Sequence, residues 1–145
     1  MSERKQAVDA MPEEVMNLVR SARRARRNAV VPLTHHAFGA ALEDDEGRIW
    51  LGCNIESEFP GHGMTAERVA LYSSLAHGAR GFKRIAIVGA AGDIMPRPCG
   101  ASLQALSEQV RDLDIILFNP DQSEWAMYRL SELLPSPESL SQVDD

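Results

Sequence analysis

The chain has 145 residues, of which 44% are hydrophobic and 25% charged, and its formal net charge is −6. This composition predicts one folded domain, residues 1–145, that buries a core without needing disulfides or metal. The acidic balance excludes the basic surface that nucleic acids require, so we expect no nucleic acid partner. No apolar stretch approaches the ~18 residues of a membrane span, so we expect no membrane partner either. Without a secretory signal or a disulfide framework, the sequence predicts a cytoplasmic protein with free thiols.

The hydrophobic pattern predicts helices and strands in the order αββαβαββ. A first helix is expected from Pro12 to about Asn28, because proline suits a first turn and apolar residues then recur at helical spacing. The other expected elements are strands at 38–42, 49–53, 84–88, 115–118 and 126–130, and helices at 65–77 and 102–110. Residues 1–11 and 136–145 are expected to be loose tails. Helices between strands favour parallel pairing, so we predict an α/β fold, a three-layer α/β/α sandwich around a mixed five-stranded sheet.

A run of arginines closes the first predicted helix. Its members are Arg20, Arg23, Arg24, Arg26 and Arg27. At helical spacing these side chains wrap around more than one face. Such a run is typical of a solvated helix surface, and the alternative is a contact with an anion or with another copy of the chain.

Two short segments stand at the starts of the second and third predicted helices. Residues 64–68 read Met-Thr-Ala-Glu-Arg, and residues 98–102 read Pro-Cys-Gly-Ala-Ser. They resemble the signature of the zinc-dependent cytidine deaminases, which is a His or Cys, a Glu two residues later, and then Pro-Cys-x-x-Cys. Four more segments resemble that family in the same order and spacing: Pro32–Leu42, Gly52–Glu56, Asp114–Asp121 and Leu130–Pro135. The resemblance runs from about residue 15 to residue 135, and it implies a cytidine-deaminase-like fold and a homo-oligomer, dimer or tetramer.

The resemblance also assigns roles within the two segments. It makes Glu67 the catalytic acid and base and Cys99 a retained thiolate, while Thr65 and Ser102 stand at the other two metal-ligand positions. A catalytic zinc site needs three Cys, His or carboxylate ligands, and a neutral hydroxyl is a poor donor to zinc. We therefore expect no zinc cofactor, and without zinc no metal-bound hydroxide forms at neutral pH.

Each of these residues has a plainer interpretation. Thr65 and Ser102 stand at predicted helix starts, where a hydroxyl caps free N–H groups for ~1 kcal/mol. Glu67 in a first turn suits the positive end of a helix. Cys99 is either a buried inert thiol or a thiol activated at a helix N-terminus, and an activated thiol with His36 or Glu67 as its base would be a nucleophile.

Further residues bear on the ligand. Asn54 and Glu56 match the family's ribose-binding pair, and their spacing of two on a strand puts them on one face; a generic Asn and Glu at a loop edge is the alternative. The resemblance adds Ala66 as a substrate contact. His36 stands where the family has a pyrimidine-contacting Phe, although two consecutive histidines are also typical of a solvated turn. The family's C-terminal aromatic, which reaches a neighbouring subunit's pocket, has no counterpart in residues 136–141.

Three functions follow from this pattern. The leading interpretation is a zinc-free cytidine-deaminase-like protein that binds a nucleoside or related small ligand and that either is catalytically silent or performs altered chemistry with Glu67 and Cys99. The second is an active hydrolytic nucleoside deaminase, a hydrolase whose zinc site is rebuilt from His36, His62 or Cys53. The third is a non-catalytic interaction protein whose old pocket is vestigial.

Overall fold

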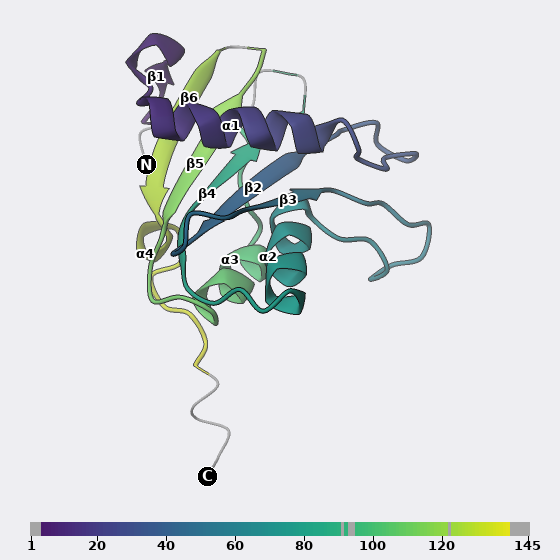
Figure 1. Ribbon diagram of the computed structural model, residues 1–145. Coiled ribbons are helices and arrows are strands. Elements are labelled where there is room, and N and C mark those ends of the chain that lie inside the picture. The colour runs from purple at the N-terminus through teal and green to yellow at the C-terminus, as the bar shows by residue number, and fades with distance from the viewer. Residues whose placement is uncertain (1–3, 91, 93–94, 122, 140–145) are drawn as a thin grey trace.

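The computed structural model describes residues 4–90, 92, 95–121 and 123–139. Within these residues, six strands form one mixed sheet in the order β1-β6-β5-β4-β2-β3. The strands are β1 (Gln6–Ala7), β2 (Gly39–Asp44), β3 (Ile49–Cys53), β4 (Phe82–Val88), β5 (Asp114–Asn119) and β6 (Glu124–Arg129). Helix α1 (Glu13–Arg26) covers one face of the sheet, and helices α2 (Ala66–Ala76) and α3 (Gly100–Ser107) cover the other (Figure 1). The predicted three-layer α/β/α sandwich is confirmed.

The predicted number of strands is wrong by one, because part of the expected loose lead-in belongs to the sheet. Gln6 and Ala7 pair antiparallel with Trp125 and Glu124 of β6, and the indole Nε1 of Trp125 donates to the carbonyl of Ala7 over 3.1 Å. A short 3-10 helix, η1 (Val8–Ala10), follows. A strand of two residues carries no alternation of apolar and polar side chains, so the sequence pattern could not reveal it.

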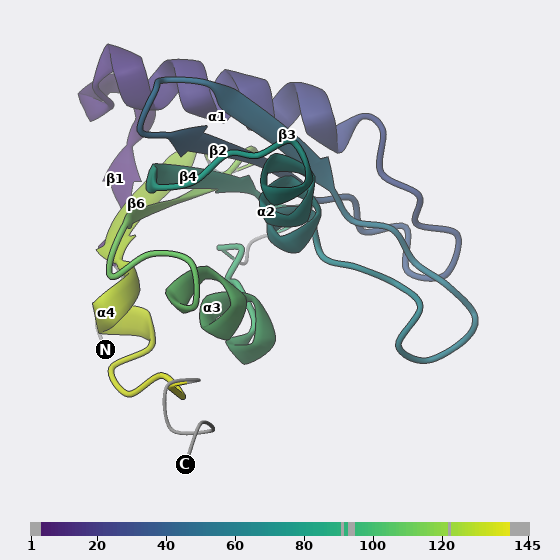
Figure 2. The same ribbon diagram turned by 60° about the horizontal axis from the view of Figure 1, so that its bottom comes forward.

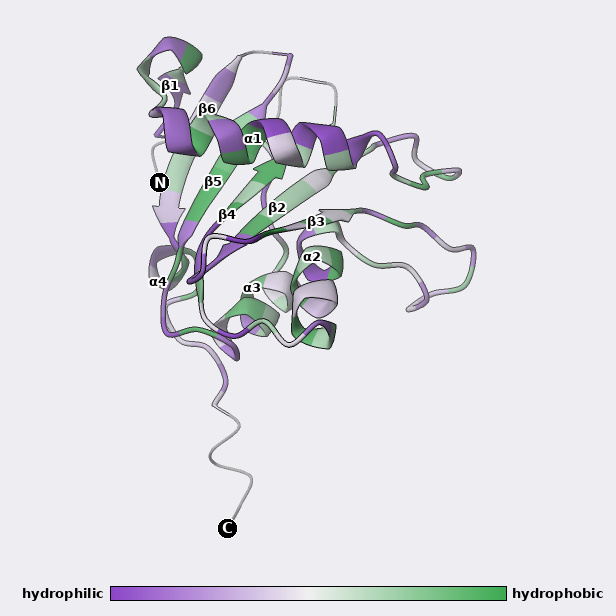
Figure 3. Cartoon of the chain, viewed as in Figure 1, coloured by the Kyte–Doolittle hydropathy of each residue, from purple (hydrophilic) through white to green (hydrophobic). Residues whose placement is uncertain are grey.

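The sheet separates two hydrophobic clusters. β4 and β5 pair in parallel, and every other pair of strands is antiparallel. Along these two central strands, successive residues alternate between the clusters. The side facing α2 and α3 receives Ile85, Ile87, Ile115 and Leu117, and the side facing α1 receives Ala86, Val88, Ile116 and Phe118. Figure 3 shows the apolar colouring concentrated on these strands, between the two layers of helices.

Gly52 sets how closely α2 approaches the sheet. A Cβ added at Gly52 would overlap the carbonyl oxygen of Ala66 and would lie 2.5 Å from the backbone nitrogen of Ala70. The first turns of α2 therefore rest directly on the backbone of β3. This contact fixes the position of Glu67 and its neighbours relative to the sheet.

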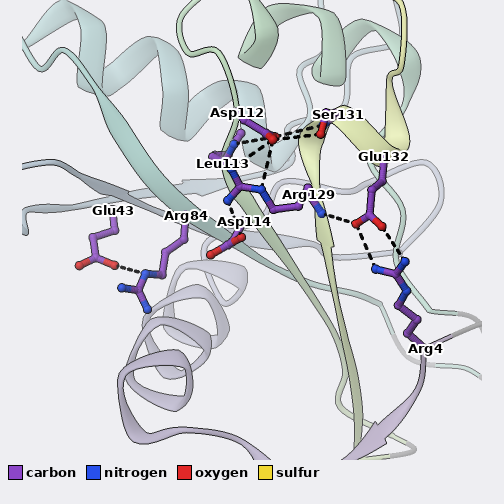
Figure 4. Close-up of polar contacts among 9 residues, drawn as sticks. All are labelled: Arg4, Glu43, Arg84, Asp112, Leu113, Asp114, Arg129, Ser131 and Glu132. Carbon is purple, nitrogen blue, oxygen red and sulfur yellow. Dashed lines mark hydrogen bonds and ion pairs between the residues drawn. The ribbon is translucent and has the colours of Figure 1, made fainter.

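Ion pairs hold the two ends of the described chain together (Figure 4). Arg129 donates to Asp114 over 2.8 Å and pairs with Asp112 over 3.1 Å. Arg4 donates to both carboxylate oxygens of Glu132 over 3.0 and 2.6 Å. Glu132 belongs to α4 (Leu130–Leu133), a single turn whose first residue the sequence pattern assigned to the preceding strand.

The described part of the C-terminal tail contacts α3. The side-chain amide of Gln104 donates to the carbonyl of Glu138 over 3.1 Å and accepts from its N–H over 3.0 Å. The remainder of the two predicted tails, residues 1–3 and 140–145, lies outside the described residues. No helix in the described ranges is both long and apolar enough to span a membrane.

Candidate functional site

A cavity of about 450 Å³ lies between the first turn of α2, the residues just before α3, and the long connections that follow α1 and β3. Its size falls in the range of ~300–1,000 Å³ that is usual for small-molecule sites. Leu33, Phe38, Phe59 and Ile87 supply apolar walls. The polar side chains on its lining come from the connection after β3 and from the starts of both helices: Asn54, Glu56, Ser57, Thr65, Glu67, Arg68, Arg97 and Cys99.

The two connections are held together by backbone pairing. Ile55 exchanges two hydrogen bonds with Met64, at 2.9 and 2.8 Å, and the N–H of Glu56 donates to the carbonyl of Val30 over 2.8 Å. Figure 2 shows the connection after α1 and the connection after β3 projecting together beyond the edge of the sheet. This pairing carries the direction of β3 onward, so Asn54 and Glu56 both reach the cavity as their spacing predicts.

Asn54 and Glu56 also brace the cavity wall. The Oδ1 of Asn54 accepts from the N–H of Phe38 over 2.8 Å, and its Nδ2 donates to the carbonyl of His36 over 2.9 Å. The Oε1 of Glu56 accepts from the backbone N–H groups of Leu33 and Thr34, each over 3.2 Å. Desolvation raises the pKa of Glu56, but hydrogen bonds from Thr34 and Leu33 outweigh that effect, and the net pKa is lowered. Glu56 therefore presents an ionised carboxylate to the cavity.

His36 is exposed and does not line the cavity in this structure. His35 adopts a φ of 60°, which turns the chain immediately before it. The aromatic side chain on the cavity wall is Phe38, two residues further on. In the segment Pro32–Leu42, the resemblance matches His36 with the family's aromatic residue and Phe38 with a valine. The sequence therefore gave no reason to consider Phe38 as the aromatic wall of the cavity.

The three positions at which the resemblance places metal ligands are brought together by the fold. The Oγ1 of Thr65 lies 3.0 Å from the Oγ of Ser102, and the Sγ of Cys99 lies 3.4 Å from that same Oγ. The Nε of Arg68 donates to both hydroxyls, over 3.1 Å to Thr65 and 3.2 Å to Ser102. We call these four residues the hydroxyl–arginine cluster.

The interpretation of Thr65 and Ser102 as helix caps is wrong. Thr65 precedes α2 but its side chain makes no capping hydrogen bond, and Ser102 is the third residue of α3, whose N-cap position is occupied by Cys99. Both hydroxyls point instead toward each other and toward Arg68. The sequence pattern located the helix starts to within two residues, and it could not give the direction of the side chains.

Arg68 constrains the hydrogen bonding in the cluster. A guanidinium only donates, so both hydroxyl oxygens accept from it and must direct their own protons elsewhere. The Thr65–Ser102 and Ser102–Cys99 contacts can each run in either direction, and when Cys99 is ionised Ser102 donates to its Sγ and Thr65 to Ser102. Desolvation and the charge of Glu67 raise the pKa of the Cys99 thiol, but hydrogen bonds from Ser102 and the charge of Arg68 outweigh them, so the net pKa is lowered. By contrast, burial raises the pKa of Cys53.

Glu67 faces the same cavity from the first turn of α2. Its residue surface is only 5% exposed, yet no side chain or N–H group among the described residues donates a hydrogen bond to its carboxyl group. No fully buried side-chain nitrogen or oxygen of the described residues lacks a partner, so the carboxyl oxygens of Glu67 open on the cavity, where a ligand or water can bond to them. Ala66 precedes it as the first residue of α2, so its backbone N–H is not used by the helix and is available to a ligand.

The donor set around Cys99 does not fit zinc. Zinc takes thiolate, imidazole and carboxylate ligands, whereas Cys99 is accompanied by two neutral hydroxyls and by a guanidinium that donates into the same space. Within the described ranges, no group of three or more His, Cys, Asp and Glu side chains is arranged to hold a metal ion. His62 stacks on Phe59 at 5.5 Å between ring centroids, and neither His62 nor Cys53 lines the cavity.

Two arginines of the cavity were missed from the sequence. Arg68 directly follows Glu67, and Arg97 lies two residues before Cys99. Arg68 ends the first matched segment and Arg97 directly precedes the second, and these positions were a signal that could have identified them. With Glu56 and Glu67, the cavity is lined by two acidic and two basic side chains.

Comparisons with known proteins agree with this architecture. No family model matches the chain. The chain is 34% identical over 129 residues to the cytidine deaminase of Halalkalibacterium halodurans, an alignment that covers 88% of this chain and 96% of that protein. It is 36% identical over 96 residues to the cytidine deaminase of Sporosarcina psychrophila, which covers 66% and 69% of the two chains. The crystal structure of cytidine deaminase from Burkholderia pseudomallei superimposes with a TM-score of 0.80 at 34% identity, over 88% of this chain and 100% of that one. The chain therefore belongs to the cytidine deaminase family.

Proposed function

We propose that this chain is a zinc-free member of its family that binds a nucleoside or a related small ligand in the cavity. The observation that carries the proposal is the hydroxyl–arginine cluster, in which the neutral hydroxyls of Thr65 and Ser102 stand beside the thiol of Cys99. A neutral hydroxyl is a poor donor to zinc, so Cys99 is the one suitable zinc ligand among these three positions. The protein therefore does not use a metal-bound hydroxide, and any hydrolase chemistry it performs uses Glu67 and Cys99 as its reactive groups.

The lining of the cavity supports a nucleoside-like ligand. The ionised carboxylate of Glu56 can accept hydrogen bonds from two sugar hydroxyls, since only its Oε1 is engaged by described residues. Phe38 and Ile87 provide apolar surface for a planar ring. At the far end, the carboxyl group of Glu67 and the free N–H of Ala66 suit the donor and acceptor edge of a pyrimidine.

Two further features support the wider proposal. Four large apolar side chains are exposed on the paired connections: Val30, Leu33, Ile55 and Phe59, with exposures from 41% to 67%. A cluster of this kind is typical of a protein interface, so the proposal includes a homo-oligomer that buries these side chains.

Both cysteines are free, as expected in a reducing compartment, and the proposal places the protein in the cytoplasm.

Elemental analysis of the purified protein tests the zinc-free state. The protein is expressed with zinc in the medium, dialysed without chelator, and compared with the double variant Thr65→Cys/Ser102→Cys prepared in parallel. We expect no stoichiometric zinc in the unaltered chain. About one zinc per chain after dialysis would contradict the proposal and favour the alternative, a hydrolytic deaminase with a rebuilt metal site.

A further inference from the structure

We propose that Cys99 is the nucleophile of a metal-free deamination, in which its sulfur forms a covalent bond to the amidine carbon of an aminopyrimidine nucleoside. This inference rests on the proposed function, because it requires that the nucleoside occupy the cavity. It goes further by naming the reacting atom of the protein and the chemical class of substrate. A zinc-bound hydroxide and a cysteine thiolate are alternative nucleophiles for the same electrophilic carbon.

The position of Cys99 is the first observation. Cys99 is exposed and lines the cavity, at the N-cap position of α3. Its Sγ is the terminal atom of the chain of contacts that begins at Arg68 and passes through Thr65 and Ser102. This arrangement supports a thiolate that is stabilised from one side and open to a ligand on the other.

Glu67 is the second and independent observation. The residue is only 5% exposed, it lines the same cavity, and its carboxyl group receives no hydrogen bond from a described residue. A carboxyl group that opens on a cavity in that state is free to bond to a ligand with N–H groups. Glu67 and Cys99 also lie close enough to interact electrostatically, and an ionised Glu67 opposes formation of the Cys99 thiolate. A nucleophile and a proton-transferring group thus face one cavity, as covalent catalysis requires.

The reaction balances without a metal, an oxidant or a reductant. The thiolate of Cys99 adds to the carbon that bears the exocyclic amine, forming a C–S bond, while protonated Glu67 delivers its proton to the ring nitrogen. Glu67 then transfers that proton from the ring nitrogen to the amine, the C–N bond breaks, and ammonia leaves a thioimidate attached to Cys99. Water adds to the same carbon and gives a proton to Glu67, the C–S bond breaks, and the thiolate returns. The net change is amine and water to carbonyl and ammonia.

Arg68 acts in this scheme as a positioning residue. It does not touch the reacting carbon, and its contribution passes through the hydroxyls of Thr65 and Ser102. Its charge compensates the thiolate whenever Cys99 is not bonded to the ligand, both before attack and after hydrolysis.

The experiment uses cytidine as the probe, in a buffer that contains a metal chelator. Conversion to uridine is followed for the unaltered protein, for Cys99→Ala and Cys99→Ser, and for Cys53→Ala as the matched control, with thermal unfolding as a check that each variant folds. Reaction mixtures are also quenched in acid, and the mass of the intact protein is measured by mass spectrometry. We expect the unaltered protein and Cys53→Ala to form uridine and to carry an adduct with the mass of cytidine less ammonia. We expect both Cys99 variants to lose about 10³-fold or more of the rate and to carry no adduct.

Calorimetry with cytidine separates this inference from the proposed function. If cytidine binds but no uridine and no adduct form, or if Cys99→Ala converts cytidine as fast as the unaltered chain, the covalent step is wrong and the proposed binding function stands. If cytidine does not bind the unaltered protein at all, the proposed function fails and this inference fails with it. Cytidine binding to Cys99→Ala with unchanged affinity, together with loss of conversion, supports a role in the reaction rather than in folding.

Discussion

The Nε of Arg68 donates to the Oγ of Ser102 across 3.2 Å, so a guanidinium from α2 meets a hydroxyl from α3 where the family resemblance places a metal ligand. The same nitrogen donates to Thr65 over 3.1 Å, and the Sγ of Cys99 lies 3.4 Å from Ser102. With hydroxyl side chains at two of the three ligand positions, Thr65, Ser102 and Cys99 are joined to one another and to Arg68 by a continuous set of hydrogen-bonding contacts.

Restoring thiols at the two hydroxyl positions is expected to restore metal binding. In Thr65→Cys/Ser102→Cys, the new side chains and Cys99 form a three-thiolate set on an unchanged backbone. The loss of the hydroxyl hydrogen bonds costs ~1 kcal/mol each, whereas good thiolate sites bind zinc with apparent free energies of ~10–16 kcal/mol. We expect about one zinc per chain by elemental analysis. Thr65→Ala/Ser102→Ala is the control and should take up none; a folded double-cysteine variant without zinc would show that Arg68 and the cavity prevent the metal site from forming.

Cys99 should react with iodoacetamide faster than Cys53 at neutral pH. Hydrogen bonds and the charge of Arg68 lower the pKa of Cys99, while burial raises the pKa of Cys53, and the thiolate is the reactive form. We expect a difference in alkylation rate of about 10-fold or more, measured by peptide mass spectrometry in the unaltered protein. Arg68→Gln should slow the alkylation of Cys99 and leave that of Cys53 unchanged. Equal rates at the two cysteines would remove the support for a stabilised thiolate.

Asp44 should make the stability of the fold dependent on pH in strongly acidic solution. Burial raises its pKa, but hydrogen bonds from Trp50, Arg48 and the N–H of Glu46 outweigh burial and lower the pKa from 3.8 to about 2. Because the folded pKa lies below the unfolded one, the stabilisation is fully present above pH 3.8 and is lost as the pH falls toward 2.

The size of this effect follows from the shift in pKa, and it is about 2 kcal/mol above the unfolded pKa. Asp44→Asn should therefore lower the free energy of unfolding at pH 7 by roughly that amount and flatten its decline in acid. Glu46→Gln, which changes an exposed carboxylate in the same turn, is the control and should have little effect. Denaturant titrations at several pH values measure the free energy of unfolding and its decline in acid. If that decline is the same in Asp44→Asn as in the unaltered protein, Asp44 does not have this role.

Gly52→Ala should destabilise the protein and disturb the cavity together. The added methyl group would overlap the carbonyl of Ala66 and press on Ala70, both of which are backbone of α2 and cannot simply rotate away. We expect a loss of ~1–3 kcal/mol, the usual cost of overpacking. Gly100→Ala is the matched control, because a Cβ at Gly100 meets nothing within 4 Å. Equal stability of the two variants by denaturant unfolding would mean that α2 does not depend on this close contact.

The layers of the fold could be predicted from the sequence because apolar residues recur with the period of a helix in α1 and alternate or cluster in the strands. β1 could not be predicted, because Gln6 and Ala7 are too short a segment to carry a period, and their pairing depends on β6 more than 100 residues away. α4 was missed for the same reason of length.

The members of the candidate site were predicted better than their interactions. Asn54, Glu56, Glu67 and Cys99 all reach the cavity, as expected from the spacing of two along an extended segment and from the family match at the two helix starts. The bonds of Arg68 to Thr65 and Ser102 depend on how α2 and α3 pack against each other, and no pattern within one segment contains that information. The exposed position of His36 likewise depends on the turn at His35 rather than on its alignment with the family.

Calorimetric titration of cytidine into the chelator-treated protein tests the central claim most directly. We predict saturable binding without added zinc, weakened by ~1.5–3 kcal/mol in Glu56→Ala, the range for a hydrogen bond to a charged group. Glu58→Ala, which removes an exposed carboxylate from the same connection outside the cavity lining, should bind as the unaltered chain does. Binding that appears only after zinc is added, or an affinity unchanged in a folded Glu56→Ala, would contradict a zinc-free nucleoside site built around this carboxylate.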